Sequence, residues 1–192
     1  MGEDFMENVA AFVPKHVFFT KGIGRDTKKL IAFEKALRDA KIAPYNLVDV
    51  SSILPPNVEE ISIDEGKMRL KDGQIVFLVM SKNESNEFNR MVTASIGVAK
   101  PADKSTYGYI SEHHEFGQTE KVSGDYAEDM AAVMLATTLG IWDFNVDQNY
   151  DEKKKLFMMS GKIVETKSIT ATAVVEKFDE WTCCVAAAVF IP

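Results

Sequence analysis

The chain lacks most features of a membrane, secreted or nucleic-acid-binding protein. Its 192 residues contain no apolar run long enough to span a bilayer, and the opening Met-Gly-Glu-Asp lacks the basic start of a secretion signal. Only 22 lysines and arginines face 29 acidic residues, a formal net charge of −7 that leaves no basic surface for nucleic acid or anionic lipid. We therefore expect a cytoplasmic protein with neither nucleic acid nor membrane as a partner.

Cysteine is also scarce, and the two that occur are adjacent. Cys183 and Cys184 lie in an apolar run that suits a strand, where neighbouring side chains point to opposite faces. That arrangement is wrong for a disulfide and poor for binding a metal. We expect two buried structural thiols.

The remaining composition is that of an ordinary globular protein. With 46% hydrophobic and 27% charged residues, the chain can bury a sizeable core, and no repeat or low-complexity segment divides it. We expect one domain, residues 1–192. Runs rich in β-branched or aromatic residues predict strands at His16–Thr20, Asn46–Val50, Ile75–Met80, Met91–Ala99, Tyr107–Phe116, Ile169–Val175 and Thr182–Phe190.

Two stretches have the spacing of a long helix. The first begins at Asp26, and the second covers Tyr126–Leu139 with Gly140 as its stop. The faces expected to be buried are Leu30, Phe33, Leu37 and Ala40 in the first helix, and Met130, Val133, Met134 and Thr137 in the second. Few helices among many strands favour an α+β layered sandwich over a parallel α/β sheet.

Other segments suggest turns and surface loops. Gly22 and Gly24 could cradle a phosphate, but without a third glycine a plain turn is the simpler interpretation. The polar interval Ser81–Arg90 and the charged stretch Asp147–Lys155 are expected to be surface excursions, not domain linkers.

The most informative stretch is residues 50–56, a serine pair in an apolar run that ends at two prolines. Prolines cannot donate ladder hydrogen bonds and they bias Leu54 away from helix, so Ser52 is expected where a strand ends in an exposed, strained turn. Its hydroxyl could attack the carbonyl carbon of Ser51, giving an ester that eliminates and hydrolyses to leave a pyruvoyl group at a new N-terminus. An ordinary serine–proline turn is the alternative.

A second candidate site lies in residues 109–116, where four ionisable side chains interrupt a strand-like run. Alternation places Glu112 and His114 on one face and His113 and Glu115 on the other. A solvated, charged strand edge is one interpretation. A single carboxylic acid in an enclosed pocket is the other, because burial raises the pKa of a glutamate and lets it donate a proton near neutral pH.

A metal site in this segment is a further alternative. His113 with Glu115, or His114 with Glu112, could join a distant ligand such as His16. The chain has only three histidines and neither H-x-H nor H-E-x-x-H spacing, so we expect no metal.

Several segments, in order along most of the chain, together resemble the pyruvoyl-dependent arginine decarboxylases. They are Ile31–Leu37 (IAFEKAL), Asn46–Pro56 (NLVDVSSILPP), Ala94–Ser105 (ASIGVAKPADKS), Gly108–Glu112 (GYISE) and Cys184–Phe190 (CVAAAVF). The S-S-I-x-P-P element joined to the later glutamate is the most specific part of the resemblance.

The resemblance implies a proenzyme that cleaves itself between Ser51 and Ser52. The β chain would be residues 1–51, and the α chain, residues 52–192, would begin with a pyruvoyl group made from Ser52. The implied fold is a four-layer αββα sandwich. Protomers would assemble as trimers, or as hexamers made of two trimers, with active sites between neighbours. No pyridoxal phosphate is required.

The resemblance also assigns three further residues. Asn46 matches an asparagine associated with self-processing and the active site, where an amide could stabilise an oxyanion. Glu112 matches the proton donor. Glu34 falls where the family usually has an aspartate that faces the substrate guanidinium, so its extra methylene makes arginine specificity less secure than the reaction type.

The implied reaction converts L-arginine to agmatine and carbon dioxide. The α-amine would condense with the pyruvoyl ketone, and the conjugated imine would accept the electrons released as carbon dioxide leaves. Glu112 would then protonate the α carbon. The alternative is an uncleaved, inactive family member that acts as a scaffold or binds a small cation between protomers.

Overall fold

The computed structural model describes residues 13–140 and 163–192. Its elements in chain order are β1 (His16–Asp26), α2 (Lys29–Asp39), β2 (Asn46–Asp49), β3 (Ile53–Leu54), β4 (Glu59–Glu60), α3 (Ile63–Met68), β5 (Ile75–Ser85), β6 (Met91–Pro101), β7 (Gly108–Phe116), α4 (Glu120–Thr138), β8 (Ile163–Val174) and β9 (Trp181–Ile191). Within these two ranges, none of the helices has the length and hydropathy needed to traverse a bilayer.

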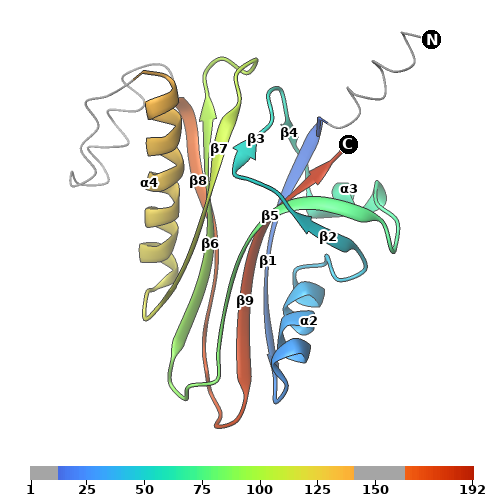
Figure 1. The fold of residues 1–192 in the computed structure, drawn as a ribbon, viewed down its shortest axis with the longest axis vertical. Coiled ribbons are helices and arrows are strands. Elements are labelled where there is room, and N and C mark those ends of the chain that lie inside the picture. Colours follow the sequence, from blue (N-terminus) through green and yellow to red (C-terminus); the bar gives the residue numbers. More distant parts are fainter. Residues whose placement is uncertain (1–12, 141–162) are drawn as a thin grey trace.

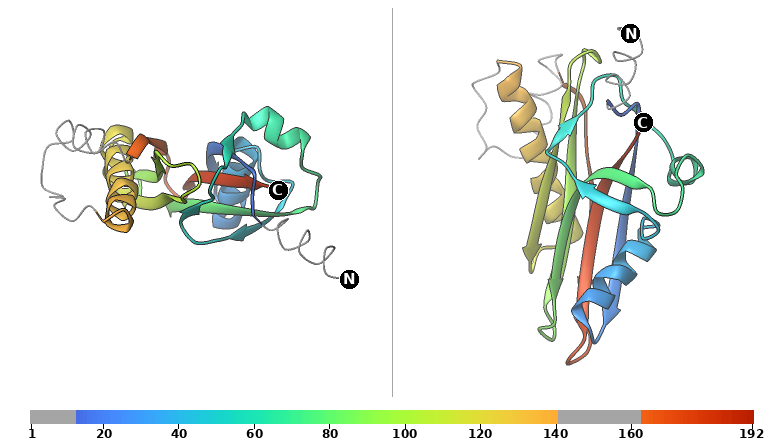
Figure 2. Two further views of the ribbon diagram at one scale, coloured as in Figure 1. Left: turned by 90° about the horizontal axis from the view of Figure 1, so that it is seen from above. Right: turned by 45° about the vertical axis from the view of Figure 1, so that its right-hand side comes forward.

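The strands form two sheets that pack face to face. One has five strands in the order β2-β5-β9-β1-β4, and the other has four in the order β3-β7-β6-β8. Helix α2 covers the outer face of the five-stranded sheet and α4 covers the outer face of the four-stranded sheet (Figure 1). Viewed from above, the same four layers lie side by side (Figure 2). The expected α+β, four-layer αββα sandwich is confirmed.

Strand β9 is buried on both of its faces, because it lies inside the sandwich. Cys183 belongs to the core beneath α2, whereas Cys184 belongs to the core between the sheets. Both thiols are free, and burial raises the pKa of each to about 12. The expectation of two buried structural thiols on opposite faces is confirmed.

Helix α2 lies unusually close to its sheet because small residues meet at the contact. A Cβ atom on Gly24 would lie 2.0 Å from the carbonyl oxygen of Ala32, and one on Gly22 would lie 2.2 Å from that of Ala36. These alanines are buried, while Leu30 is 73% exposed. The glycine pair is therefore part of strand β1, neither a turn nor a phosphate cradle, and the prediction that Leu30 is buried is wrong.

Helix α4 packs on its sheet in the same way. A Cβ atom on Gly97 of β6 would lie 2.0 Å from the carbonyl oxygen of Ala127. The core beneath the helix consists of Ala99, Ala131, Ala132, Leu135 and Ala136, with Tyr109 and Leu139 packed against it. The predicted face is wrong: Thr137 is exposed and the three larger residues Met130, Val133 and Met134 are only half-buried. Gly140 follows the helix with a φ of 72°, as expected for its stop.

The predicted surface excursion Ser81–Arg90 is half wrong: residues 81–85 are partly buried strand, whereas residues 86–90 form an exposed turn as expected. Strand β5 continues to Ser85 because its polar side chains reach the other sheet. The hydroxyl of Ser81 donates to the carbonyl oxygen of His113 (2.7 Å), and the amide of Asn83 donates to that of Glu115 (2.9 Å). The stretch Asp147–Lys155 lies outside the described residues.

Replacing Gly24 with alanine should destabilise the protein by about 1–3 kcal/mol, the usual scale for overpacking, because the new methyl group must displace α2 from β1. Urea unfolding of Gly24→Ala measures this loss, and Thr27→Ala, at an exposed position between the two elements, is the control. Equal stability of the two variants would mean that the helix can move away from the strand at little cost.

Candidate active site

The serine pair lies where the chain crosses from one sheet to the other. The N–H group of Val50 donates to the carbonyl oxygen of Leu78 in the five-stranded sheet (2.9 Å). Two residues later, the carbonyl oxygen of Ser52 accepts from the N–H group of Ile110 in the four-stranded sheet (2.9 Å). The crossing from β2 to β3 is visible in Figure 1. As expected, the serines follow the end of a strand.

The scissile bond expected from the sequence lies in a tight turn. The N–H group of Ile53 donates to the carbonyl oxygen of Ser51 (2.8 Å), a contact between residues i+2 and i that defines a γ-turn centred on Ser52. The φ angle of Ser52 is not positive, so this is the common inverse form, without the backbone strain that we expected. The Ser51 carbonyl is thus polarised by a hydrogen-bond donor in the resting turn.

The two hydroxyl groups at this turn are unoccupied by other interactions. Ser51 is exposed and Ser52 is half-buried. Neither hydroxyl forms a hydrogen bond with any residue that the structure describes. The Ser52 oxygen is therefore available as a nucleophile.

Pairing of β3 with β7 brings Glu112 near the serine pair. Leu54 lies opposite Gly108 and Ile53 lies opposite Tyr109, so the antiparallel register leads from Ser52 to Ile110. Glu112 is two residues farther along β7, about 7 Å at the usual rise of a strand. Its side chain shares a face with that of Ile110, which belongs to the core between the sheets.

Glu112 is exposed in the single chain, not enclosed in a pocket as one interpretation of the sequence suggested, yet its surroundings still shift its pKa upward. Burial raises the pKa of Glu112, the negative charge of Asp49 raises it further, and the nearby His114 opposes the shift. A glutamate in this position keeps its proton to a higher pH than one in water, which is what a general acid requires.

Asp49 is a functional candidate that the sequence analysis missed. It is the last residue of β2, three positions before Ser52, and it lines a cavity of about 280 Å³ between β2 and α2. Burial raises the pKa of Asp49, and a hydrogen bond from the Met80 N–H group partly offsets this rise. The available signal was a carboxyl group two residues before Ser51, separated from it only by Val50. Its proximity to Glu112 depends on two sheets and has no local signature.

Asn46 lies at the other end of β2. Its side-chain amide donates to the carbonyl oxygen of Gly73 (2.7 Å). It lies five positions before Ser51 in the sequence, about 16 Å at the rise of an extended strand. The structure therefore does not bring this amide to the Ser51 carbonyl within one protomer.

Glu34 is also separate from the serine pair. It lies on α2, which covers the outer face of the five-stranded sheet, and it forms an ion pair with Arg38. It lines a cavity of about 380 Å³ that also contains Lys41 and Lys67. A substrate cation at Glu34 would compete with these neighbouring positive charges.

The remaining ionisable residues of β7 follow the predicted alternation. The ring of His113 lies on the α4 side, with its centroid 4.4 Å from that of Tyr126 and its Nε2 atom 3.1 Å from the side-chain oxygen of Gln118. His16 instead contacts Arg69 (2.9 Å). Across residues 13–140 and 163–192, no group of three or more histidine, cysteine or acidic side chains is placed to hold a metal.

Replacing Asp49 with asparagine should lower the pKa of Glu112, because it removes a negative charge that opposes ionisation. Glu112 would then lose its proton at a lower pH than in the unaltered protein. Carboxyl-carbon NMR titration measures the change, with Asp64→Asn on α3 as the control, since Asp64 is not among the charges acting on Glu112. An unchanged Glu112 titration would show that the two carboxyl groups do not interact.

Comparison with known proteins gives a single consistent result. The family model for pyruvoyl-dependent arginine decarboxylase matches residues 16–192. The chain is 55% identical over 182 residues to a probable pyruvoyl-dependent arginine decarboxylase of Chlorobaculum tepidum, covering 95% of this chain and 99% of the relative.

Two further relatives are about half identical to the chain. A pyruvoyl-dependent arginine decarboxylase of Thermoplasma volcanium is 51% identical over 183 residues, 95% of this chain and 99% of its own length. Pyruvoyl-dependent arginine decarboxylase 2 of Methanosarcina acetivorans is 49% identical over 179 residues, 93% of this chain and 97% of its own length. With this similarity extending from β1 to the final residue, the chain belongs to the pyruvoyl-dependent arginine decarboxylase family.

Proposed function

We propose that this protein is a self-processing decarboxylase that converts L-arginine to agmatine and carbon dioxide with a pyruvoyl group made from Ser52. Membership of the family supports the reaction and the substrate. The observation that carries the proposal is the turn at the serine pair, where a free Ser52 hydroxyl follows a Ser51 carbonyl that already accepts a hydrogen bond. Glu112 lies a short distance along the neighbouring strand.

Self-cleavage begins with attack of the Ser52 hydroxyl oxygen on the carbonyl carbon of Ser51. The C–O bond forms, the C–N bond between the two residues breaks, and the amide becomes an ester. Negative charge collects on the Ser51 carbonyl oxygen during this step, and the Ile53 N–H group is aimed at that atom at 2.8 Å. Elimination then breaks the bond between the ester oxygen and the β carbon of residue 52, which releases residues 1–51 with a new carboxylate and leaves a dehydroalanine. Water hydrolyses the imine tautomer of that residue, which releases ammonia and leaves a ketone at residue 52.

The turn fits the group that it would carry. It presents residue 52 directly before β3, with its carbonyl oxygen accepting from the N–H group of Ile110. The pyruvoyl ketone supplies an electron-withdrawing carbonyl that makes loss of carbon dioxide possible. Glu112 is the candidate donor to the α carbon, and burial together with the negative charge of Asp49 raises its pKa in the direction that favours this role.

Assembly of several protomers would complete the site. Glu34 and Asn46 line cavities apart from the serine turn, so one chain alone does not gather all the assigned residues. Val48, Ile75 and Phe77 are 39%, 62% and 41% exposed. They belong to the inner side of β2 and β5, beyond the region covered by the four-stranded sheet. This uncovered apolar face near the serines supports a homotrimer or hexamer with active sites between neighbours.

Replacing Ser52 with alanine should give a folded, full-length, inactive protein, because the variant loses the nucleophile and only one hydroxyl group. Intact-mass measurement under denaturing conditions reports the outcome. The unaltered protein should yield two fragments split between residues 51 and 52. Ser52→Cys should cleave more slowly, through a thioester.

The same measurement separates the proposal from an inactive scaffold. A single full-length mass for the unaltered protein would support the scaffold, and cleavage that persists in Ser52→Ala would place the scissile bond elsewhere. Thermal melting of Ser52→Ala distinguishes loss of chemistry from loss of fold.

Replacing Glu112 with glutamine should spare more of the maturation than of the turnover. Glutamine keeps the shape of the side chain but cannot deliver a proton, and loss of a general acid usually costs about 10²–10⁴ in rate. The cleaved fraction of Glu112→Gln is isolated and assayed for carbon dioxide release at saturating arginine. Near-normal turnover would transfer the donor role to another group, His114 on the same face being the first to test.

Mixed oligomers test whether Glu34 serves the site of a neighbouring protomer. Glu34→Gln should cleave but turn over poorly, and Ser52→Ala should be inactive while keeping Glu34. The two variants are mixed in equal amounts, dissociated and reassembled. In a head-to-tail ring, about one quarter of the sites would then take an intact Ser52 from one variant and an intact Glu34 from its neighbour. Native mass spectrometry confirms mixing, and mixed particles without recovered activity would place Glu34 and Ser52 of one site on the same chain.

A further inference from the structure

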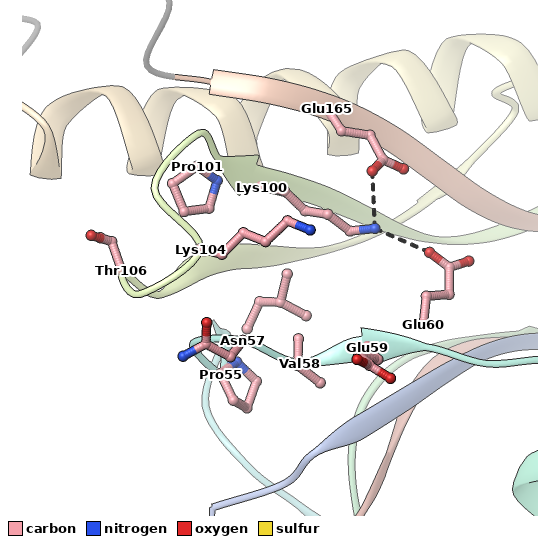
Figure 3. Close-up of a pocket in the computed structure, with 12 residues that line it drawn as sticks. Pro55, Asn57, Val58, Glu59, Glu60, Lys100, Pro101, Lys104, Thr106 and Glu165 are labelled. Atoms are coloured by element: carbon pink, nitrogen blue, oxygen red, sulfur yellow. Dashed lines mark hydrogen bonds and ion pairs between the residues drawn. The ribbon is translucent and has the colours of Figure 1, made fainter.

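An ionic cluster at one end of the sandwich consists of four side chains, Glu60, Lys100, Glu165 and Lys167. The ammonium group of Lys100 lies 3.1 Å from the Glu60 carboxylate and 3.0 Å from the Glu165 carboxylate (Figure 3). Lys167 forms a further ion pair with Glu60, and its ammonium group lies 4.1 Å from the centre of the Phe19 ring. Glu60 and Phe19 belong to the five-stranded sheet, whereas the other three residues belong to the four-stranded sheet. The ionic cluster therefore joins the two sheets.

The strand registers place these charged side chains between the sheets. Glu60 pairs with Val17, which belongs to the core between the sheets. On the other sheet, Lys100 follows Val98 by two residues on β6, and Lys167 lies opposite Val98 on β8. Val98 belongs to the same core. Residues of both sheets also line a cavity of about 560 Å³ beside the ionic cluster. The sheets are therefore not packed directly against each other here, and the ion pairs bridge the gap.

The charges of the ionic cluster compensate one another. Burial alone would raise the pKa of Glu60, but the hydrogen bonds from Lys167 and Lys100 outweigh it and hold that pKa below its usual range. Burial alone would lower the pKa of Lys100, but its hydrogen bonds to Glu165 and Glu60 raise that pKa instead. Both groups therefore stay charged near neutral pH. Removing one partner would leave the opposite charge without its compensation between the sheets.

Glu60 ends a segment, residues 52–60, that would begin with the pyruvoyl group. Cleavage would make residue 52 a chain end, and chain ends are poorly ordered unless other contacts hold them. The strands of this segment are β3 and β4, with two residues each. Strands this short open locally at a low cost in free energy. The far end of the segment, at Glu60, is held by side chains of the opposite sheet.

We propose that the ionic cluster positions the pyruvoyl group. It fixes the far end of residues 52–60 against the four-stranded sheet, which also carries Glu112. Because residue 60 is held by β6 and β8, residue 52 has little freedom to leave its place beside Ile110. A misplacement of about 1 Å can lower a turnover rate about a hundredfold, so this restraint matters for catalysis. The inference rests on the proposed self-cleavage, which creates the free chain end.

Hydrogen exchange in the full-length Ser52→Ala chain tests the restraint without cleavage. The N–H group of Ile110 donates to the carbonyl oxygen of residue 52, so its exchange reports release of the segment. Adding Glu60→Gln should speed this exchange about tenfold or more, the scale of a lost hydrogen bond to a charged group. The N–H group of Val50 bonds to the five-stranded sheet and should exchange at an unchanged rate.

Glu120→Gln is the matched control. Glu120 on α4 forms an ion pair of 2.8 Å with Lys21 on β1, so this pair also links the two halves of the sandwich. Lys21 lies four residues, about 13 Å, along β1 from the position paired with Glu60. The control therefore loses an ion pair of the same kind away from the segment, and exchange at Ile110 should not change.

Reversing the charges tests whether the ion pair itself provides the restraint. Glu60→Lys alone sets three lysines against one glutamate and should give the fastest exchange at Ile110. The double variant Glu60→Lys with Lys167→Glu restores two charges of each sign, so it should recover slow exchange. Far-ultraviolet circular dichroism verifies that each variant is folded.

Turnover of the cleaved protein tests the consequence for catalysis. The cleaved fractions of Glu60→Gln and Glu120→Gln are assayed for carbon dioxide release over a range of arginine concentrations. Glu60→Gln should lower kcat about tenfold with a smaller change in KM, because the ionic cluster sets the place of the ketone and not the contacts with the rest of the substrate. Glu60→Lys with Lys167→Glu should recover most of kcat.

Three results would overturn the proposal. They are unchanged exchange at Ile110 in Glu60→Gln, an equal rise in exchange at Ile110 and Val50, and equal turnover of the cleaved Glu60→Gln and Glu120→Gln proteins. The second would reduce the ionic cluster to general stabilisation. A single full-length mass for the unaltered chain would instead remove self-cleavage, and with it the group to be positioned. The exchange result is distinct from that failure, because it is measured in an uncut chain.

Discussion

The passage of the chain between the two sheets is the constraint on which the candidate site depends. Buried backbone groups must find hydrogen-bond partners. A strand that leaves one sheet for another has no neighbouring strand to bond with between the two. Val50 is still held by the first sheet and Ser52 is already held by the second, so the carbonyl group of Ser51 takes the N–H group of Ile53 instead. Because the backbone N–H group of Ile53 already bonds to that carbonyl, neither serine hydroxyl is needed as its partner, and both stay free. The arrangement at the serine pair thus arises from topology and not from an unfavourable φ angle.

Much of the layered fold was predictable from the sequence, because alternation and β-branched residues identify strands even when their ends are misplaced. The helix faces were not predictable in this way. Periodicity gives most weight to large apolar residues such as Leu30, whereas the contact with β1 needs small ones such as Ala32 beside Gly24. The end of β5 was also not predictable, because its polar residues suggested an exposed loop. Asn83 is buried because it bonds to the facing sheet, and a single sequence does not reveal that neighbour.

The candidate site was predictable residue by residue but not as an arrangement. Ser52 and Glu112 stand out by local pattern and family resemblance, yet their proximity follows from the register between β3 and β7. Asp49 acts on Glu112 from the other sheet, so its influence has no sequence spacing to detect. The matches at Asn46 and Glu34 lie apart from the serine turn in one protomer, since each faces a cavity next to α2.

The position of β1 has a consequence for a chain cut between Ser51 and Ser52. All 11 residues of β1 pair with β9, and β1 separates β9 from β4 inside the five-stranded sheet. The smaller piece would therefore remain as an internal strand, an outer helix and an edge strand of a single folded body, although the two cysteines are free and no covalent bond joins the pieces. Such a nicked protein would travel as one particle in gel filtration. Its two polypeptides would part only when the fold itself is lost.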